Sequence, residues 1–163
     1  GVELDPRTRG TVVDQSMQTG VPGIFACGNV LYVHDLHDNV TTESARAGTA
    51  AAAYPLGCDT GADAGAADPG CQLTVSPASI AGYALPGRIT TGALTKLNFR
   101  VRQPIDAARV RILAGDEELL AGKVRPFKPS VMESFPLPAK IIQQALDLGA
   151  NEIVLSIDPV EEA

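Results

Sequence analysis

The sequence has no uninterrupted apolar run near the roughly 20 residues that a membrane-crossing helix needs. It also has no clustered basic stretch, and its formal net charge is −6. Nucleic acids and anionic membranes bind proteins through Lys and Arg side chains that displace counterions from phosphate. We therefore expect no nucleic acid and no membrane among the partners.

Cysteine is scarce, and its spacing shows no pairing pattern. Only Cys27, Cys58 and Cys71 occur, and no two of them form a Cys-x-x-Cys motif. An odd number of unpaired thiols is typical of a reducing compartment, which favours the cytoplasm. Cys58 and Cys71 could bridge under oxidation. Cys27 ends an apolar run, and we expect a small buried side chain there because dithiol chemistry needs a paired Cys.

The chain also lacks an initiator Met and the basic-then-apolar pattern of a secretory signal. Its 163 residues are enough for one domain, or for a short segment joined to one small domain. We therefore expect that the chain continues an upstream polypeptide and is not exported.

Composition divides the chain into three regions. Residues 1–54 end in an alanine-rich run with high helix propensity, which Pro55 stops. Residues 55–72 are small and polar, and they predict a linker rich in Gly, Ala and Asp. Residues 73–163 contain short apolar or β-branched runs broken by Pro and Gly, and they predict a β-rich domain.

The β-rich region has one helical pattern among its strands. We predict strands at residues 73–75, 94–101, 110–113, 119–124, 131–137 and 153–157. Residues 139–148 predict a helix at the open end of the sheet, with Gly149 as its stop. Residues 129–133 are interpreted as a turn entering a strand rather than as a partner contact. The pattern indicates an α+β chain with a small antiparallel sandwich.

The most informative stretch lies in the first region. A hairpin is predicted at residues 2–14, followed by a buried strand at residues 24–27, a loop, and a helix beginning near Thr41. In α/β sheets, ligands bind at the carboxyl ends of strands, where helix amino termini present unpaired N–H groups. Gly28 would let a ligand approach the backbone, and Asn29 would offer a hydrogen-bonding side chain to a chain of hydroxyls.

Residues 19–29, Thr-Gly-Val-Pro-Gly-Ile-Phe-Ala-Cys-Gly-Asn, precede a helix containing Ser-Ala-Arg-Ala-Gly-Thr-Ala-Ala-Ala. This order resembles the second FAD-binding motif of the pyridine nucleotide-disulfide oxidoreductase superfamily, over about a third of the chain. The motif commonly ends in Gly-Asp. The resemblance implies that residues 1–54 are the tail of a Rossmann-like FAD-binding α/β domain.

The resemblance also implies roles for five residues. Gly28 and Asn29 would hold the ribityl or pyrophosphate part of FAD. Val40, Thr41 and Thr42 would bring backbone N–H groups to the pyrimidine edge of the flavin. Asn29 replaces the usual Asp, so an acceptor remains, a donor is added and one negative charge is lost. No catalytic residue is assigned.

The loop at residues 31–40 resembles flavoproteins described as FAD-dependent dehydrogenases of glycerol or amine metabolism, in which Val-His-Asp-Leu follows the Gly-Asn pair. The weaker likeness continues through residues 75–80, 97–102 and 129–133, which resemble the terminal β domain of that branch. The implied function is part of an oxidoreductase that transfers electrons between FAD and a nicotinamide cofactor, NAD(P), or a small-molecule substrate.

The chain lacks the Gly-x-Gly-x-x-Gly fingerprint that grips the FAD pyrophosphate, and it lacks a nicotinamide-binding unit. We therefore expect the isolated chain to be inactive and to need upstream FAD and NAD domains, or a partner subunit, or a homodimer mate. Residues 1–54 are expected to dock on the β domain or on a second copy, or to be mobile. The alternative function is a docking or dimerisation module that pairs through an edge strand beside residues 94–101.

His34, Asp35, His37 and Asp38 raise the question of a metal site, because imidazole and carboxylate are common metal ligands. No further ligand cluster appears in the sequence, so we do not favour metal. Two readings of the histidines stay open. One of them acts near the flavin as a proton donor or hydrogen-bond partner, or the loop is simply polar and packed against upstream residues.

Overall fold

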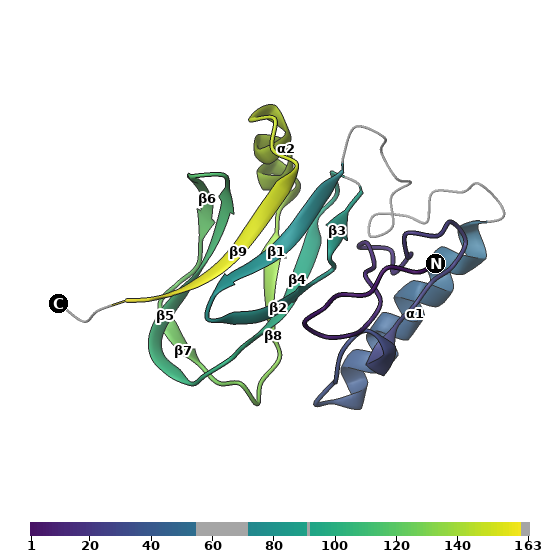
Figure 1. Ribbon diagram of the computed structural model, residues 1–163, viewed down its shortest axis with the longest axis horizontal. Coiled ribbons are helices and arrows are strands. Elements are labelled where there is room, and N and C mark those ends of the chain that lie inside the picture. The colour runs from purple at the N-terminus through teal and green to yellow at the C-terminus, as the bar shows by residue number, and fades with distance from the viewer. Residues whose placement is uncertain (55–71, 91, 161–163) are drawn as a thin grey trace.

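The computed structural model describes residues 1–54, 72–90 and 92–160. Most of the predicted linker, with Cys58 and Cys71, lies outside these residues. The described part is mixed α+β, with a short 3-10 turn η1 (Gly28–Val30), two α-helices and two sheets (Figure 1). The helices are α1 (His37–Ala53) and α2 (Ala139–Asp147). Neither of them is long and apolar enough to span a membrane.

The larger sheet has the order β3-β1-β9-β5-β6, and β7 also pairs with β5. The smaller sheet has the order β2-β4-β8. The bounds are β1 (Leu73–Ser79), β2 (Ala81–Leu85), β3 (Arg88–Ile89), β4 (Thr95–Val101), β5 (Ile105–Ala114), β6 (Glu117–Ala121), β7 (Arg125–Phe127), β8 (Glu133–Leu137) and β9 (Glu152–Pro159). All pairs are antiparallel except β1 with β9, which is parallel.

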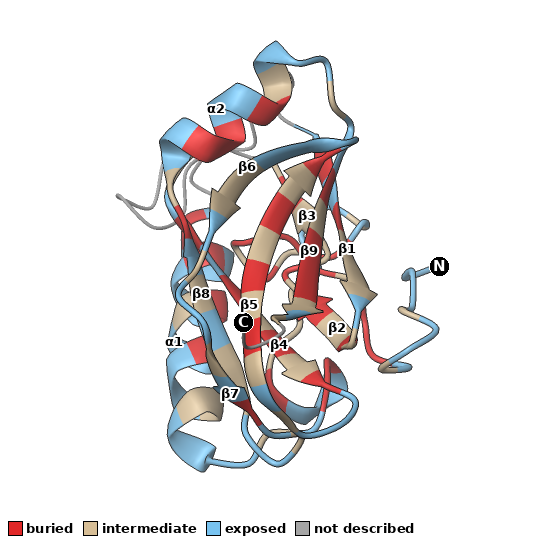
Figure 2. Cartoon of the chain, turned by 90° about the vertical axis from the view of Figure 1, so that its left-hand side faces the viewer, coloured by how far each residue is buried: buried red, intermediate tan, exposed pale blue. Residues whose placement is uncertain are grey.

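Inward-facing residues of both sheets form one core. Alternate residues of β4 and β5 are buried, as the period of a strand requires (Figure 2). α2 covers one end of the sheets and buries Ile141, Ile142 and Ala145, and it ends before Gly149 at φ +71°. The predicted helix and the mostly antiparallel β-rich architecture are confirmed. The parallel pair β1–β9 was not expected.

Three of the described strands were not predicted from the sequence, namely β2, β3 and β7. Gly82 and Pro126 interrupt the apolar alternation of β2 and β7, and β3 has only two residues. β4 itself lies between β2 and β8, so the edge strands beside residues 94–101 are β2 and β8, and docking through one of them stays a prediction. The backbone hydrogen-bonding groups of β4 are therefore already engaged by two neighbouring strands.

Residues 1–54 contain isolated bridges and one helix, and they show no Rossmann-type sheet. The predicted hairpin is present in short form: Leu4 bridges Thr11, and the N–H of Asp5 donates to the carbonyl of Gly10 at 2.8 Å. The predicted buried strand at residues 24–27 is wrong. Only Phe25 makes a bridge, and Ile24 is 46% exposed, because no neighbouring strands cover this stretch in the described residues.

The first segment docks on the β domain, which is one of the expected outcomes. The purple coil of its early residues lies between α1 and the strands (Figure 1). The carbonyl of Val13 accepts the N–H groups of Gly87 at 3.0 Å and Arg88 at 3.2 Å. The Thr90 hydroxyl donates to Asp14 Oδ2 at 3.2 Å. A second, smaller core of residues 13–47 packs against Tyr83, Leu85 and Met132 of the β domain.

Candidate functional site

The candidate site lies where residues 25–29 reach the amino-terminal half of α1. The Phe25 ring contacts Tyr54 with centroids 6.0 Å apart, and Cys27 Sγ lies 3.6 Å from Ser44 Oγ. One residue later, the Gly28 N–H donates to Glu43 Oε2 at 3.1 Å. As the chain proceeds from residue 25 to residue 28, its contacts shift from Tyr54 to Glu43, toward the amino terminus of α1. Residues 25–28 therefore run antiparallel to the helix. A strand and the helix that follows it have this relation in α/β units.

Gly28 has φ +74°, in the left-handed region that favours glycine. A Cβ atom at this position would lie 3.2 Å from Val40 Cγ1. The position that a Cβ atom would occupy at Gly28 therefore points toward α1. The structure requires glycine here for close packing on the helix, rather than for the ligand approach that the sequence suggested.

Glu43 is the buried centre of the site, only 7% exposed. Its Oε1 accepts the Tyr32 hydroxyl at 2.5 Å, and its Oε2 lies 3.1 Å from His34 Nε2 as well as accepting the Gly28 N–H. The Tyr32 and His34 rings also contact each other, with centroids 4.3 Å apart. We call Gly28, Tyr32, His34 and Glu43 the Glu43 cluster.

The cluster keeps Tyr32 protonated. Burial, and then the hydrogen bond to Glu43, raise the pKa of Tyr32 far above its ordinary value. The phenol therefore remains a donor to the carboxylate at neutral pH. Sequence reasoning missed Tyr32 and Glu43. One signal was available, because Glu43 shares a helix face with Ala47 and Ala50, at the spacing of a buried stripe.

Asn29 is exposed beside this cluster. Its Oδ1 accepts the backbone N–H of His34 at 3.3 Å, and its amide nitrogen has no hydrogen-bond partner among the described residues. The side chain that the FAD motif assigns to the cofactor thus holds the following loop through its oxygen and keeps a free donor.

Val40, Thr41 and Thr42 lie deeper in α1 than expected, because the helix begins at His37 rather than near Thr41. Their N–H groups fall where a helix bonds to its own preceding turn, and the unpaired N–H groups lie about one turn earlier. The Thr41 and Thr42 hydroxyls donate to backbone carbonyls four residues back, at 3.1 and 3.0 Å.

The four residues considered for metal binding do not come together. The His34 side chain is 2% exposed within the Glu43 cluster, whereas the His37 side chain is 92% exposed beside Asp38. Asp35 pairs with Arg100 at 2.5 Å. Within residues 1–54, 72–90 and 92–160, no group of three or more His, Cys, Asp or Glu side chains is arranged to hold a metal ion.

Arg100 of β4 fastens the loop after η1 to the β domain. Besides Asp35, it donates to the carbonyls of Val33 at 3.0 Å and Pro129 at 3.3 Å, and to the Tyr83 hydroxyl at 3.0 Å. Its side chain is only 17% exposed and links the two regions.

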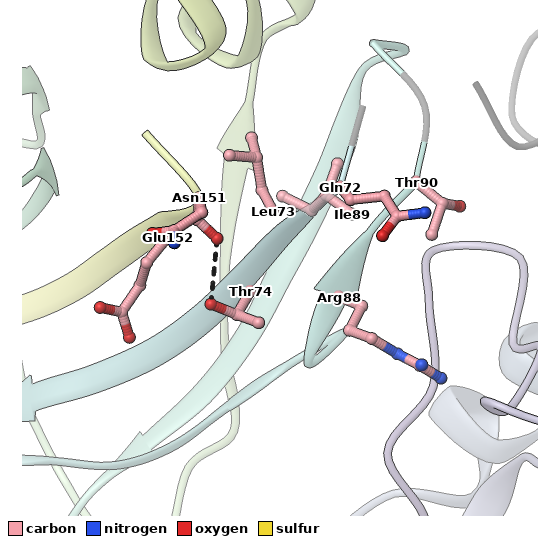
Figure 3. A pocket seen from close by; sticks show the side chains of 8 residues that line it. All are labelled: Gln72, Leu73, Thr74, Arg88, Ile89, Thr90, Asn151 and Glu152. Carbon is pink, nitrogen blue, oxygen red and sulfur yellow. Dashed lines mark hydrogen bonds between the residues drawn. The ribbon is translucent and has the colours of Figure 1, made fainter. Parts of the chain in front are cut away.

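A hollow of about 520 Å³ lies at the ends of β1, β3 and β9, away from these residues. Figure 3 shows its lining, in which the Thr74 hydroxyl donates to the carbonyl of Asn151 at 3.2 Å. Glu152, the one acid that the described part of the chain contributes to this lining, already accepts the hydroxyl of Ser76. None of the residues assigned from the sequence lines this hollow.

In comparisons with known proteins, no family model, no curated protein and no solved structure matches this chain. The assignment of the site therefore rests on the residues described above.

Proposed function

We propose that the chain is part of a flavin-dependent oxidoreductase that transfers electrons between FAD and NAD(P) or a small-molecule substrate. One observation carries the proposal. Residues 25–28 run antiparallel to α1, so that Gly28 and Asn29 lie at the amino-terminal half of the helix. In α/β folds, ligands bind where a segment of this course ends beside the partial positive charge of the helix amino terminus. Residues 25–28 keep that course, although only Phe25 makes a strand bridge.

The residues present fit an FAD molecule in their chemistry. Asn29 is exposed and has a free amide donor, which suits a ribityl hydroxyl or a pyrophosphate oxygen. The amino end of α1 suits the negative charge that a reduced flavin carries. The buried carboxylate of Glu43 is held by three donors and fixes the turn that presents Asn29. When bound, FAD supplies the electron-transfer chemistry, and this chain positions it.

Exposed apolar side chains around the site support a larger assembly. Ile24, Val30, Val33 and Leu36 are exposed in the described structure, close in sequence to Asn29. Large apolar side chains that stay exposed along one short stretch of chain favour a surface that another polypeptide covers. We infer that upstream FAD and NAD domains or a partner subunit cover them in the cytoplasm, where the thiol of Cys27 stays reduced.

The test is the flavin content of the native polypeptide, captured from its source with antibodies against this chain. We expect a yellow protein that releases one FAD per chain on denaturation. In that polypeptide, Asn29→Ala should weaken FAD retention by about 1–3 kcal/mol, which is about 5- to 150-fold. Asn29→Asp should retain FAD.

Asn151→Ala is the matched control, because Asn151 is an exposed asparagine far along the chain whose side chain makes no hydrogen bond with the described residues. A native polypeptide without flavin would refute the proposal. Equal flavin loss in the Asn29→Ala and Asn151→Ala proteins would refute the role of Asn29.

A further inference from the structure

A second hollow, of about 330 Å³, lies between α1 and the smaller sheet. It is lined by Asn39, Thr42, Glu43 and Arg46 of α1, Lys96 and Asn98 of β4, Met132, and Ser134 of β8. A neighbouring hollow of about 90 Å³ shares Arg46 and Lys96 with it. These two cations therefore stand between the two hollows, and they come from the two regions of the chain that dock together.

The lining is rich in hydrogen-bond donors. Arg46 is half-buried and Lys96 is exposed, and neither forms an ion pair with any of the described residues. Neutral donors come from Asn39 and Ser134. A site in which two cations and several neutral donors converge is suited to an oxyanion.

Glu43 is the only acid among the described residues of the lining, and its charge is already shared among donors. Its two oxygens take the Gly28 N–H and the Tyr32 hydroxyl, and one of them lies 3.1 Å from His34 Nε2. The two cations outnumber this single carboxylate. The balance of charge in the hollow therefore favours an anion.

The volume limits the size of the ligand. Pockets for small molecules commonly measure about 300–1,000 Å³, so this hollow lies at the small end of the range. It has room for one oxyanion on a short carbon skeleton. A ligand held by Arg46 and Lys96 together would bridge α1 and β4, and it would stabilise the docked arrangement of the two regions.

We propose that this hollow binds the carboxylate or phosphate group of a small organic molecule, with Arg46 and Lys96 as its charged partners and Asn39 and Ser134 as neutral donors. The proposal does not depend on the flavin role. Of the residues assigned to FAD, only Thr42 lines the hollow.

The experiment is a nuclear magnetic resonance titration of the whole chain with sodium phosphate and, separately, sodium malonate, with sodium chloride at matched ionic strength as the reference. We expect saturable shifts of the backbone amides of Thr42, Lys96 and Ser134 with at least one oxyanion and not with chloride. Tighter binding of phosphate would indicate a phosphate ester as ligand, and tighter binding of malonate would indicate a carboxylate.

Arg46→Gln and Lys96→Gln should each weaken oxyanion binding about tenfold or more, because each removes a charge-assisted partner. Lys140→Gln removes an exposed lysine of α2, outside the lining, and serves as the control. If Arg46→Gln disturbs folding, Lys96→Gln alone decides, because Lys96 is exposed. Shifts that chloride reproduces, or equal weakening by Lys140→Gln, would overturn the proposal.

Discussion

Glu43→Ala removes the acceptor on which the candidate site depends. The substitution leaves the Tyr32 hydroxyl and the Gly28 N–H without their partner in a buried place, and it separates His34 from its carboxylate. Hydrogen bonds to a charged group contribute about 1.5–3 kcal/mol each, and neighbours in one network do not add fully. We therefore expect a loss of about 3–5 kcal/mol in the stability of the docked first segment.

The Gly28 amide reports this loss directly, because its N–H donates to Glu43 Oε2 at 3.1 Å. A loss of about 3–5 kcal/mol in the stability of the docked segment should speed its hydrogen exchange about 150- to 5,000-fold. Glu43→Gln keeps one acceptor oxygen and should have a smaller effect. Thr49→Ala is the control on α1, because Thr49 is exposed and its hydroxyl donates to the Ala45 carbonyl of the same helix at 2.9 Å.

A second readout is the ionisation of Tyr32, followed by the nuclear magnetic resonance signals of its ring, because absorbance would also report Tyr54 and Tyr83. Burial raises its pKa most, and the hydrogen bond and charge of Glu43 raise it further, so Glu43→Gln should lower the pKa of Tyr32 without restoring its ordinary value. Since the folded pKa lies above the unfolded one, this contribution to stability is complete below about pH 10 and is lost as pH rises further. Unchanged Gly28 exchange in Glu43→Ala, with unchanged Tyr32 titration in Glu43→Gln, would refute the reasoning.

Two further predictions concern the scaffold. Residues 72–163 alone should give a β-rich circular dichroism spectrum and unfold cooperatively in urea, because the larger core draws only on residues 73–157; a helical or unfolded spectrum would contradict this. Burial raises the pKa of Asp14, although hydrogen bonds from Gln18, Ser16 and Thr90 lower it. At pH 7, Asp14→Asn should match or exceed the natural chain in stability, whereas Asp14→Ala should lose about 2–3 kcal/mol through unpaired N–H groups. Because the folded pKa of Asp14 is raised, the stability of the natural chain relative to Asp14→Asn should increase as pH falls through that pKa. Urea unfolding of both proteins at pH 7 and pH 4 measures this difference. An equal difference at the two pH values would show that the carboxylate is solvated.

The sequence by itself determined the elements whose pattern is local. Alternating burial in residues 95–101 and 108–114 follows directly from the order of apolar and polar side chains, because successive side chains of a strand point to opposite faces. The helix at Ala139–Asp147 has its apolar face and its glycine stop within ten residues. The need for glycine at position 28 was also visible, although its reason, the close approach to Val40, was not.

The start of helix α1 is not marked by any local sequence signal. It begins after Leu36, which makes no side-chain capping hydrogen bond, so no capping residue marked the start four residues before Thr41. The pairing of β1 with β9 joins strands at the two ends of the β domain, and no turn between them fixes their partner or their direction.

Only the tertiary structure decided which side chains share a site. In the sequence, Glu43 is one polar residue of a helical pattern. Only in the folded chain do the turn at Gly28 and the ring of Tyr32 bury its carboxylate. Arg46 and Lys96 are fifty positions apart and meet only because residues 1–54 dock on the β domain. The periodicity of apolar residues indicates which face of a helix or strand is buried. Which element packs on that face depends on contacts between residues far apart in the sequence, and local sequence patterns do not contain that information.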